Sequence, residues 1–158
     1  MFSRVGVGGT FSLLHKGHKV LIATAFKCAK EVVIGLSSDI LVKSLRKQHF
    51  VPNYEVRFKI LYNFLKTQGY LSKALIVPLL DPYGPAIDDR RMDAIVVSEE
   101  GYKRALEINS LRRKHGLEEL HIIVVRMVLA EDGKPINCTR IMRGEIDVEG
   151  RVIRKETL

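Results

Sequence analysis

The sequence predicts a single α/β domain over residues 1–158, in which a parallel sheet lies between two layers of helices. Short β-branched runs alternate with helical segments along the chain, and this alternation is typical of strand–helix–strand units. A length of 158 residues suits one domain with a sizeable core, and no repeat, linker or low-complexity segment divides it. The glycines after the first strand stand where such folds bind ligands.

Five short apolar runs, rich in valine and isoleucine, predict the strands. The run EVVIGL is the clearest of them, because a strand buried on both faces of a parallel sheet shows no polar alternation. The predicted strands cover residues 4–8, 31–36, 74–80, 94–97 and 120–125. Because ligands bind beyond the carboxyl ends of parallel strands, we expect the functional site in segments 8–18, 37–47, 81–91, 98–104 and 137–143.

Helical segments connect these strands. Residues 17–30 are apolar on most faces, as a helix packed on a sheet requires, and Val56, Ile60 and Phe64 give an amphipathic spacing after Asn53. A third helix over residues 100–115 ends at Gly116, which suits the position after a helix C-terminus. Two short helices complete the set, one from Ser38 or Asp39 to about Lys47 and one that begins at Thr139.

Composition and cysteine usage exclude several classes of protein. The net charge of +8 attracts polyanions, which include phosphorylated small molecules and nucleic acid. No apolar run is long enough to cross a membrane and the N-terminus does not resemble a signal peptide, so we expect a cytoplasmic protein without membrane contact. Cys28 and Cys138 are far apart and in no CxxC pair, which argues against a disulfide framework or a cysteine zinc site.

The junction after the first strand reads GGTFSLLHKGH over residues 8–18. It is not a GxGxxG loop, because Phe11 occupies a required glycine position, and a leucine excludes a Walker A loop in the same way. Gly8 and Gly9 still allow the backbone to approach a ligand closely. The helix that follows directs its unpaired N–H groups and its dipole toward an anion, so the junction predicts a phosphate site.

His15 and His18 carry the chemistry expected of this junction. Three residues apart, they share one face at the helix start, and Gly17 leaves room beside them. An imidazole near a triphosphate is biased toward its charged form and can donate hydrogen bonds to phosphate oxygens. A histidine pair at this spacing is often structural, but its coincidence with the glycines and Thr10 favours function. We expect no protein-bound metal, because no third ligand lies nearby in sequence.

The junction resembles the GTFDxxHxGH signature of the HxGH nucleotidylyltransferases, with Ser12 where that family usually has aspartate. Further blocks resemble the same family in order: GLSSD at residues 35–39, YEVR at 54–57, VSEE at 97–100 followed by Ile108 and Asn109, and INCTRIMRGEID at 136–147. With DPYGP at residues 81–85, the combination is most similar to archaeal phosphopantetheine adenylyltransferases. The resemblance implies a Rossmann-like nucleotidylyltransferase fold that moves AMP from ATP to 4′-phosphopantetheine, giving dephospho-coenzyme A and pyrophosphate.

This reaction suggests roles for the residues of the junction. The acceptor phosphate is already an anion, so catalysis requires positioning and charge stabilisation rather than a covalent enzyme group. We expect the main-chain N–H groups of residues 9–11 and the Thr10 hydroxyl to hold the acceptor phosphate beside the α-phosphate. His18 then stabilises the charge that grows on the α-phosphate, and His15 holds the β- or γ-phosphate.

Other blocks complete the expected site. Thr139 caps the last helix and contacts the β- and γ-phosphates with Arg140 and Arg143, since arginine offers forked donors; the alternative for both arginines is a solvated helix face. The remaining candidates are Lys43 or Lys47 at the acceptor phosphate, Arg57 near the acceptor or in a surface ion pair with Glu55, and Ser98, Glu99 and Glu100 at the adenine base. Magnesium is expected with ATP, bound through phosphates and water.

The chain departs from the family pattern at several positions. Asn137 and Cys138 replace two serines, Gly101 replaces a threonine, and Met142 moves the second arginine to Arg143. Asparagine can still hydrogen-bond a phosphate, so we expect activity. Cysteine is usually a small buried side chain, so we expect Cys138 to pack inward while its loop acts through backbone N–H groups.

Alternative functions remain open at the sequence level. Nicotinamide mononucleotide, FMN, or glycerol 3-phosphate with CTP would suit the same local chemistry, and only the chain-wide resemblance favours 4′-phosphopantetheine. A non-catalytic nucleic-acid-binding domain would interleave aromatic and basic residues on an exposed face, whereas only 7% of residues are aromatic and none is tryptophan. A catalytically inactive nucleotide sensor would tolerate loss of the HKGH and TRIMR segments, which this chain retains. The oligomeric state is not indicated.

Overall fold

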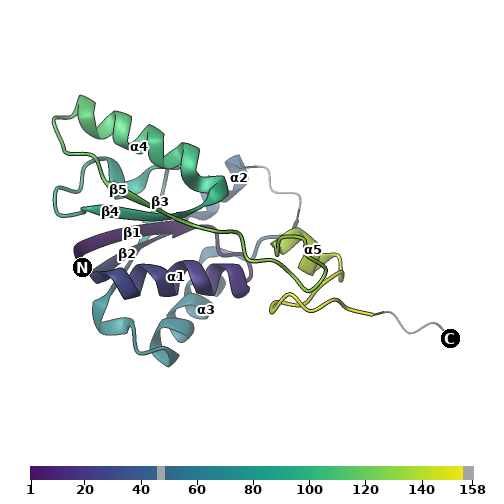
Figure 1. The fold of residues 1–158 in the computed structure, drawn as a ribbon. Coiled ribbons are helices and arrows are strands. Elements are labelled where there is room, and N and C mark those ends of the chain that lie inside the picture. Colours follow the sequence, from purple (N-terminus) through teal and green to yellow (C-terminus); the bar gives the residue numbers. More distant parts are fainter. Residues whose placement is uncertain (46–48, 155–158) are drawn as a thin grey trace.

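The computed structural model of the chain is a five-stranded parallel sheet with helices on both faces (Figure 1). It describes residues 1–45 and 49–154. The strands are β1 Phe2–Gly9, β2 Ala29–Ser37, β3 Ala74–Leu79, β4 Ala94–Ser98 and β5 His121–Val125. The helices are α1 Lys16–Cys28, α2 Asp39–Ser44, α3 Tyr54–Thr67, α4 Tyr102–Lys114 and α5 Cys138–Met142. The predicted α/β/α fold is therefore confirmed.

The strand order creates the crevice in which a ligand can bind. The strands pair in the order β3-β2-β1-β4-β5, so the chain builds outward from β1 to β3 and then crosses back to place β4 beside β1. The β1–β2 ladder continues to Gly9 and Leu36, whereas the β1–β4 ladder ends at Gly6 and Ile95. Beyond that pair, the carboxyl ends of β1 and β4 diverge at the point where strand order reverses.

Two apolar cores hold the layers together. Helices α1 and α3 cover one face of the sheet and α4 covers the other (Figure 1). Val5 and Ile34 are fully buried in the first core, which also contains Ile22 of α1. Val33 contacts the second core, with Ile108 of α4. Each buried aliphatic side chain contributes roughly 1.5–3 kcal/mol, so the sheet that carries the crevice is a rigid base.

The boundaries of two predicted helices differ in the structure. The last helix begins at Cys138, and its N-cap is Asn137 rather than Thr139. The Oδ1 atom of Asn137 accepts a hydrogen bond from the Arg140 N–H at 2.8 Å. Because asparagine is as good an N-cap as serine, its presence here preserves the helix start. The helix predicted from residue 100 begins instead with a 3-10 turn over Glu99–Gly101.

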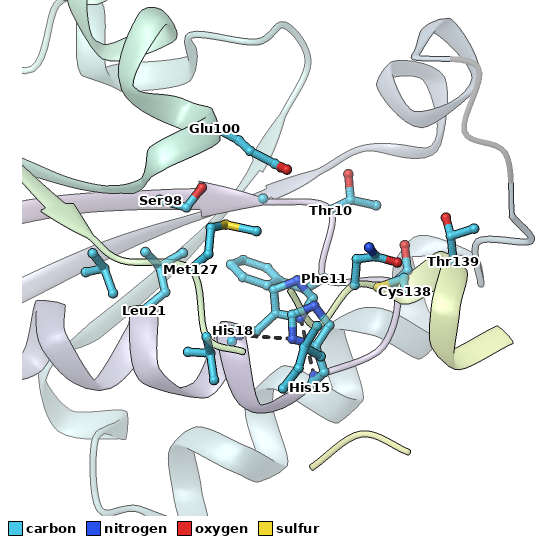
Figure 2. Close-up of a pocket in the computed structure, with 18 of the residues that line it drawn as sticks. Thr10, Phe11, His15, His18, Leu21, Ser98, Glu100, Met127, Cys138 and Thr139 are labelled. Atoms are coloured by element: carbon cyan, nitrogen blue, oxygen red, sulfur yellow. Dashed lines mark hydrogen bonds between the residues drawn. The ribbon is translucent and has the colours of Figure 1, made fainter. Parts of the chain in front are cut away.

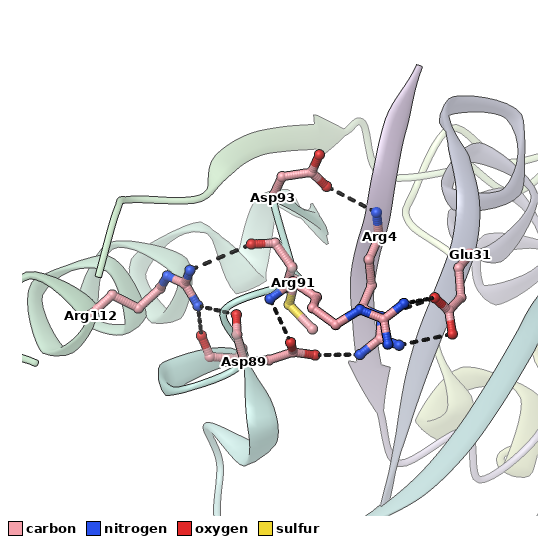
Figure 3. Close-up of polar contacts among 8 residues, drawn as sticks. Arg4, Glu31, Asp89, Arg91, Asp93 and Arg112 are labelled. Carbon is pink, nitrogen blue, oxygen red and sulfur yellow. Dashed lines mark hydrogen bonds and ion pairs between the residues drawn. The ribbon is translucent and has the colours of Figure 1, made fainter. Parts of the chain in front are cut away.

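An ion-pair network holds the amino-terminal end of the sheet together (Figure 3). Arg4 of β1 pairs with Glu31 of β2 and with Asp89, each at 2.9 Å. Arg112 of α4 is 2% exposed and donates hydrogen bonds to the carbonyl oxygens of Ala86 and Asp89 at 2.8 and 3.0 Å. The network fastens the connection before β4 at the end of the sheet opposite the crevice, so its role is structural.

We expect Arg4→Met to lower the free energy of unfolding at neutral pH and to make it depend less on pH under acidic conditions. Desolvation alone would raise the pKa of Asp89. The hydrogen bond and charge of Arg4, together with backbone hydrogen bonds from Arg91 and Met92, outweigh it and hold the pKa below its ordinary value. Such a carboxylate adds stability above its unfolded-state pKa, near 4, and this stability is lost as the pH falls through the lower folded-state pKa. Urea unfolding between about pH 2 and pH 7 measures the effect.

The control for this prediction is Arg91→Met. Arg91 is 74% exposed and lies 3.6 Å from Glu31, and exposed pairs of this kind contribute little. Parallel stability curves for the wild type and Arg4→Met over the whole pH range would contradict the proposed linkage.

No helix of the described segments is long and apolar enough to cross a membrane.

Candidate active site

A pocket of about 480 Å³ opens where β1 and β4 diverge (Figure 2). Its walls come from the end of β1, the start of α1, the ends of β4 and β5, and the start of α5. Figure 2 shows Leu21, Ser98 and Met127 toward one end, Thr139 at the other, and His18 between them. Nine of the predicted site residues line it together: Gly8, Gly9, Thr10, Phe11, His15, His18, Ser98, Glu100 and Thr139.

The turn between β1 and α1 is held in an unusual backbone conformation. Phe11 has a φ of 48°, and no other described residue except glycine has a positive φ. A bulky residue in this region costs of order 1–3 kcal/mol, and such strain is often found at functional sites. The Phe11 ring is buried and packs edge-on against His18, with ring centroids 5.1 Å apart. The turn therefore fixes the orientation of the His18 ring.

The two histidines form one unit at the start of α1. Their rings stack with centroids 3.6 Å apart, and His15 is the N-cap, whose Nδ1 accepts from the His18 N–H at 3.3 Å. The Nδ1 of His18 lies 2.7 Å from the carbonyl oxygen of Leu13. Because a carbonyl only accepts, this Nδ1 carries the hydrogen. The Nε2 of His18 is then an acceptor in the neutral ring and becomes a donor on protonation.

The same tautomer determines which acceptor the His15 N–H group uses. The His15 N–H lies 3.3 Å from the Nδ1 of His18, but a nitrogen that already carries a hydrogen in the ring plane cannot accept. This N–H instead donates to the carbonyl oxygen of Leu13 at 2.9 Å. The Leu13 carbonyl thus orients both histidines.

Gly17 gives the His15 ring the space it occupies, and burial determines the charge of that ring. A Cβ atom at Gly17 would lie 2.8 Å from the Cε1 atom of His15, which confirms that the glycine leaves room for the ring. Burial lowers the pKa of His15 to about 4, so this ring is neutral at neutral pH without nucleotide. The charged form that the sequence analysis expects for His15 therefore requires the triphosphate itself to offset desolvation.

Two parts of the pocket were missed by the sequence analysis. His49 lies with its Nδ1 3.1 Å from the Thr139 hydroxyl and its Nε2 3.4 Å from the Ser12 hydroxyl, so it joins the β1–α1 turn to α5. No motif covered His49, and only its proximity in the fold reveals it. Residues 125–128 also line the pocket. Residue 125 ends β5 and residues 126–128 follow it, so the rule that ligands bind beyond strand ends would have found them if it had been applied to the fifth strand.

Arg57 is a correction to the sequence analysis. The side chain is fully buried and donates to the carbonyl oxygens of Thr10 at 2.9 Å and Ser37 at 2.8 Å. Its ion pair is with Asp39 at 3.1 Å, so the predicted surface pair with Glu55 and the predicted place on a polar face are both wrong. The physical reason is that β1 and β2 end here, and their last carbonyls need donors.

The buried face of α3 lies one residue away from the face that the sequence predicts. Val56 and Ile60, predicted to be buried, are 44% and 39% exposed, whereas Arg57, Leu61 and Leu65 are fully buried at the same i, i+4, i+8 spacing. Because an arginine occupies the first position of this spacing, a prediction based on apolar residues did not find the buried face.

Comparison with known proteins identifies the family. Residues 7–144 match the family described as cytidylyltransferase-like. The chain belongs to this family. It is 46% identical over 156 residues to a phosphopantetheine adenylyltransferase of Methanosarcina mazei, covering 97% of this chain and 98% of that protein. It is 44% identical to the Methanopyrus kandleri enzyme of the same name over 92% of each chain.

Two further comparisons add a longer relative and a solved structure. A bifunctional phosphopantetheine adenylyltransferase/NTP phosphatase of Thermoplasma volcanium is 47% identical over 94% of this chain, which spans 44% of that longer protein. A solved Archaeoglobus fulgidus protein, described as of unknown function, has a TM-score of 0.70 and 33% identity over 77% of this chain and 88% of its own. These relatives place the chain among the phosphopantetheine adenylyltransferases of the cytidylyltransferase-like family.

Several side chains that were predicted to bind the substrates lie outside the pocket. Arg140 is paired with Asp132 and, at 2.9 Å, with Glu145, so its contact with phosphate stays a prediction that requires these pairs to open. Arg143, the residue that follows α5, and Lys43 of α2 are exposed, and their roles also stay predictions. Lys47 lies outside the described residues.

Glu99 supports the wall of the pocket but does not line it. Its Oε1 atom accepts a hydrogen bond from the Met127 N–H at 3.4 Å, which links the end of β4 to the segment after β5. Its neighbour Glu100 does line the pocket. Contact of either residue with adenine stays a prediction.

Cys138 is buried, as predicted, and lies beside the two histidines. It is 9% exposed, and its sulfur lies 3.9 Å from the carbonyl oxygen of Leu13. One potential metal-binding atom from each of His15, His18 and Cys138 lies within 4.8 Å of the other two. The third ligand that was not found near the histidines in sequence is therefore supplied from a segment more than a hundred residues away.

Proposed function

We propose that this chain is an adenylyltransferase that moves AMP from ATP to 4′-phosphopantetheine, giving dephospho-coenzyme A and pyrophosphate. The observation that carries the proposal is the meeting of two pockets at the end of β1. A second pocket of about 420 Å³ shares Gly8, Gly9, Thr10, Ser98 and Glu100 with the first. In-line transfer requires the acceptor phosphate to lie against the α-phosphate, and two adjoining sites satisfy this requirement.

The second pocket supports a slender, partly apolar acceptor. Its walls combine the strand-end glycines with apolar side chains, among them Leu79, Tyr83, Met92, Val97 and Ile108. The pantetheine arm carries a dimethyl group and two amides, so it can bury apolar atoms along such a wall. Glycerol 3-phosphate is too small and polar to use this surface. The phosphopantetheine adenylyltransferases named above support the same acceptor.

The first pocket suits an adenine nucleotide. Leu21, Val125 and Met127 provide an apolar surface at the end near Ser98, where a purine can be sandwiched. The hydroxyl groups of Thr10 and Thr139 lie toward the other end (Figure 2). We infer that the base binds beside Met127 and that the triphosphate runs past His18 toward the start of α5.

The reaction requires no covalent enzyme intermediate. An oxygen of the acceptor phosphate forms a bond to the α-phosphorus while the bond from that phosphorus to the α,β-bridging oxygen breaks, and pyrophosphate leaves with the electron pair. The protonated Nε2 of His18 donates to an α-phosphate oxygen as charge grows there, and Phe11 and Leu13 hold its ring in place. Pre-positioned donors of this kind require no rearrangement at the moment of transfer.

Magnesium enters with the nucleotide as part of the substrate. Glu100 is the one carboxylate among the described residues that line the first pocket, which does not make a protein cage for the ion. Magnesium is normally bound by phosphates and water with one or two carboxylates, so the donor set fits MgATP. The soluble, phosphorylated substrates also agree with the cytoplasmic location that the sequence predicts.

A pyrophosphate-release assay over a panel of substrates tests the proposal. We expect ATP with 4′-phosphopantetheine to exceed every other pair by roughly 10²-fold or more in kcat/KM, because only this pair uses both pockets. The panel pairs ATP and CTP with 4′-phosphopantetheine, nicotinamide mononucleotide, FMN and glycerol 3-phosphate, and mass spectrometry identifies each product. Equal or better turnover with CTP, or with another acceptor, would refute the assignment.

A further inference from the structure

Three soft or borderline metal ligands meet at the pocket from two distant segments. His15 and His18 lie at the start of α1, and Cys138 is the first residue of α5 (Figure 2). Among the described residues, this is the one group of three metal-binding side chains whose ligand atoms all lie within 4.8 Å of one another. The cluster contains no carboxylate, so its chemistry differs from that of a magnesium site.

The three ligand atoms lie near enough for one zinc ion to bind after a local rearrangement of the side chains. At bond lengths of about 2.0–2.1 Å to nitrogen and about 2.3 Å to sulfur, tetrahedral ligands lie roughly 3.3–3.6 Å apart. The two rings now stack, with centroids 3.6 Å apart and planes 18° apart, and a metal lies in the plane of each imidazole that binds it. The His15 ring must therefore turn out of this stack before both histidines can bind one ion, while the Leu13 carbonyl holds the His18 ring. The Nδ1–H of His18 already donates to the Leu13 carbonyl at 2.7 Å, which is how metal-binding histidines commonly fix their tautomer.

The cysteine determines which metal the cluster suits. A hydroxyl is a poor ligand for zinc, whereas a thiolate is among the best. Cys138 therefore completes a donor set of two imidazoles and one thiolate at the place where the triphosphate binds.

We propose that His15, His18 and Cys138 bind Zn²⁺, with a water in the fourth position, and that bound zinc inhibits the enzyme by competing with MgATP. The Cys138 thiol loses its proton to solvent when the metal binds. Zinc then occupies His18, which can no longer donate to the α-phosphate. The inhibitory part of this proposal rests on the proposed adenylyltransferase function, whereas the metal site does not.

Cobalt binding tests the site without any enzyme assay. Co²⁺ adopts zinc geometry, and a cysteine ligand gives it a thiolate-to-metal absorption band in the near ultraviolet. We expect one equivalent of Co²⁺ to produce this band in the wild type and excess Zn²⁺ to remove it. Cys138→Ser should lack the band, and Cys138→Ala serves as a second variant if serine disturbs folding. Cys28→Ser, at the far end of α1, is the matched control and should keep the band.

Inhibition is measured by pyrophosphate release at fixed MgATP over a series of buffered free Zn²⁺ concentrations. Each variant is compared with its own zinc-free rate. We expect Cys138→Ser to require roughly tenfold to hundredfold more zinc for half inhibition than the wild type and Cys28→Ser, because a ligand has been removed.

The outcomes separate the two parts of the proposal. A missing cobalt band in the wild type, or a band that survives in folded Cys138→Ser, would overturn the site. A normal band with equal zinc sensitivity in all three proteins would overturn the inhibition. If the proposed adenylyl transfer is not detected with any substrate, the cobalt titration still decides whether the site exists.

Discussion

His18→Ala is expected to lower kcat by about 10²-fold or more while KM for ATP changes little. The expectation follows from the position of the ring, which the Leu13 carbonyl and the Phe11 ring hold before any substrate binds. A donor fixed in this way acts mainly on charge that grows in the transition state, so its loss lowers the rate more than it weakens ATP binding.

Steady-state kinetics with saturating 4′-phosphopantetheine measure this effect, and single-turnover kinetics separate chemistry from product release. His115→Ala is the matched control, because this histidine is exposed beyond the end of α4, and it should behave as the wild type. A rise in KM with unchanged kcat would mean that His18 only binds the ground state. If neither constant changed, the mechanism would be wrong and His18 would be structural.

The parts of this molecule that the sequence predicted are those determined by local chain geometry. The strand, the GGTF turn, the histidine pair and Gly17 are contiguous, so their mutual placement follows from the geometry of a strand that enters a helix. Ser98 lies where a site was expected, because the ends of parallel strands gather at one edge of a sheet, whereas Thr139 was identified through the resemblance to the family.

The parts that were missed depend on contacts between distant segments. Nothing local predicts that Cys138 lies against the histidines or that His49 joins Ser12 to Thr139. The prediction for Arg57 was wrong for a more general reason. Charged residues are mostly exposed, so this arginine was assigned to the surface. Only the carbonyls left unpaired at the ends of β1 and β2 explain why it is buried.

Those carbonyls make Arg57→Met the substitution with the largest expected loss of stability. The guanidinium donates to the carbonyl oxygens of Pro52, Thr10 and Ser37 at 2.7 to 2.9 Å. Removing it leaves buried acceptors without donors, and we expect a loss of about 3–5 kcal/mol. This is a large part of the roughly 5–15 kcal/mol that a domain of this kind has. Asp39 is 51% exposed, so its share of the effect is small.

The same substitution should impair catalysis even in the fraction that remains folded. The Thr10 carbonyl adjoins Phe11, whose positive φ is sustained only while the surrounding contacts hold the turn. Urea unfolding measures stability, and kcat/KM measured well below the unfolding transition reports on the turn. Arg57→Lys should recover little of either, because an ammonium cannot reproduce a planar fork of donors. Lys59→Met, exposed on the same helix, should stay within about 0.5 kcal/mol of the wild type. A loss below about 1 kcal/mol for Arg57→Met, with normal kinetics, would show that water replaces the arginine and that the turn holds itself.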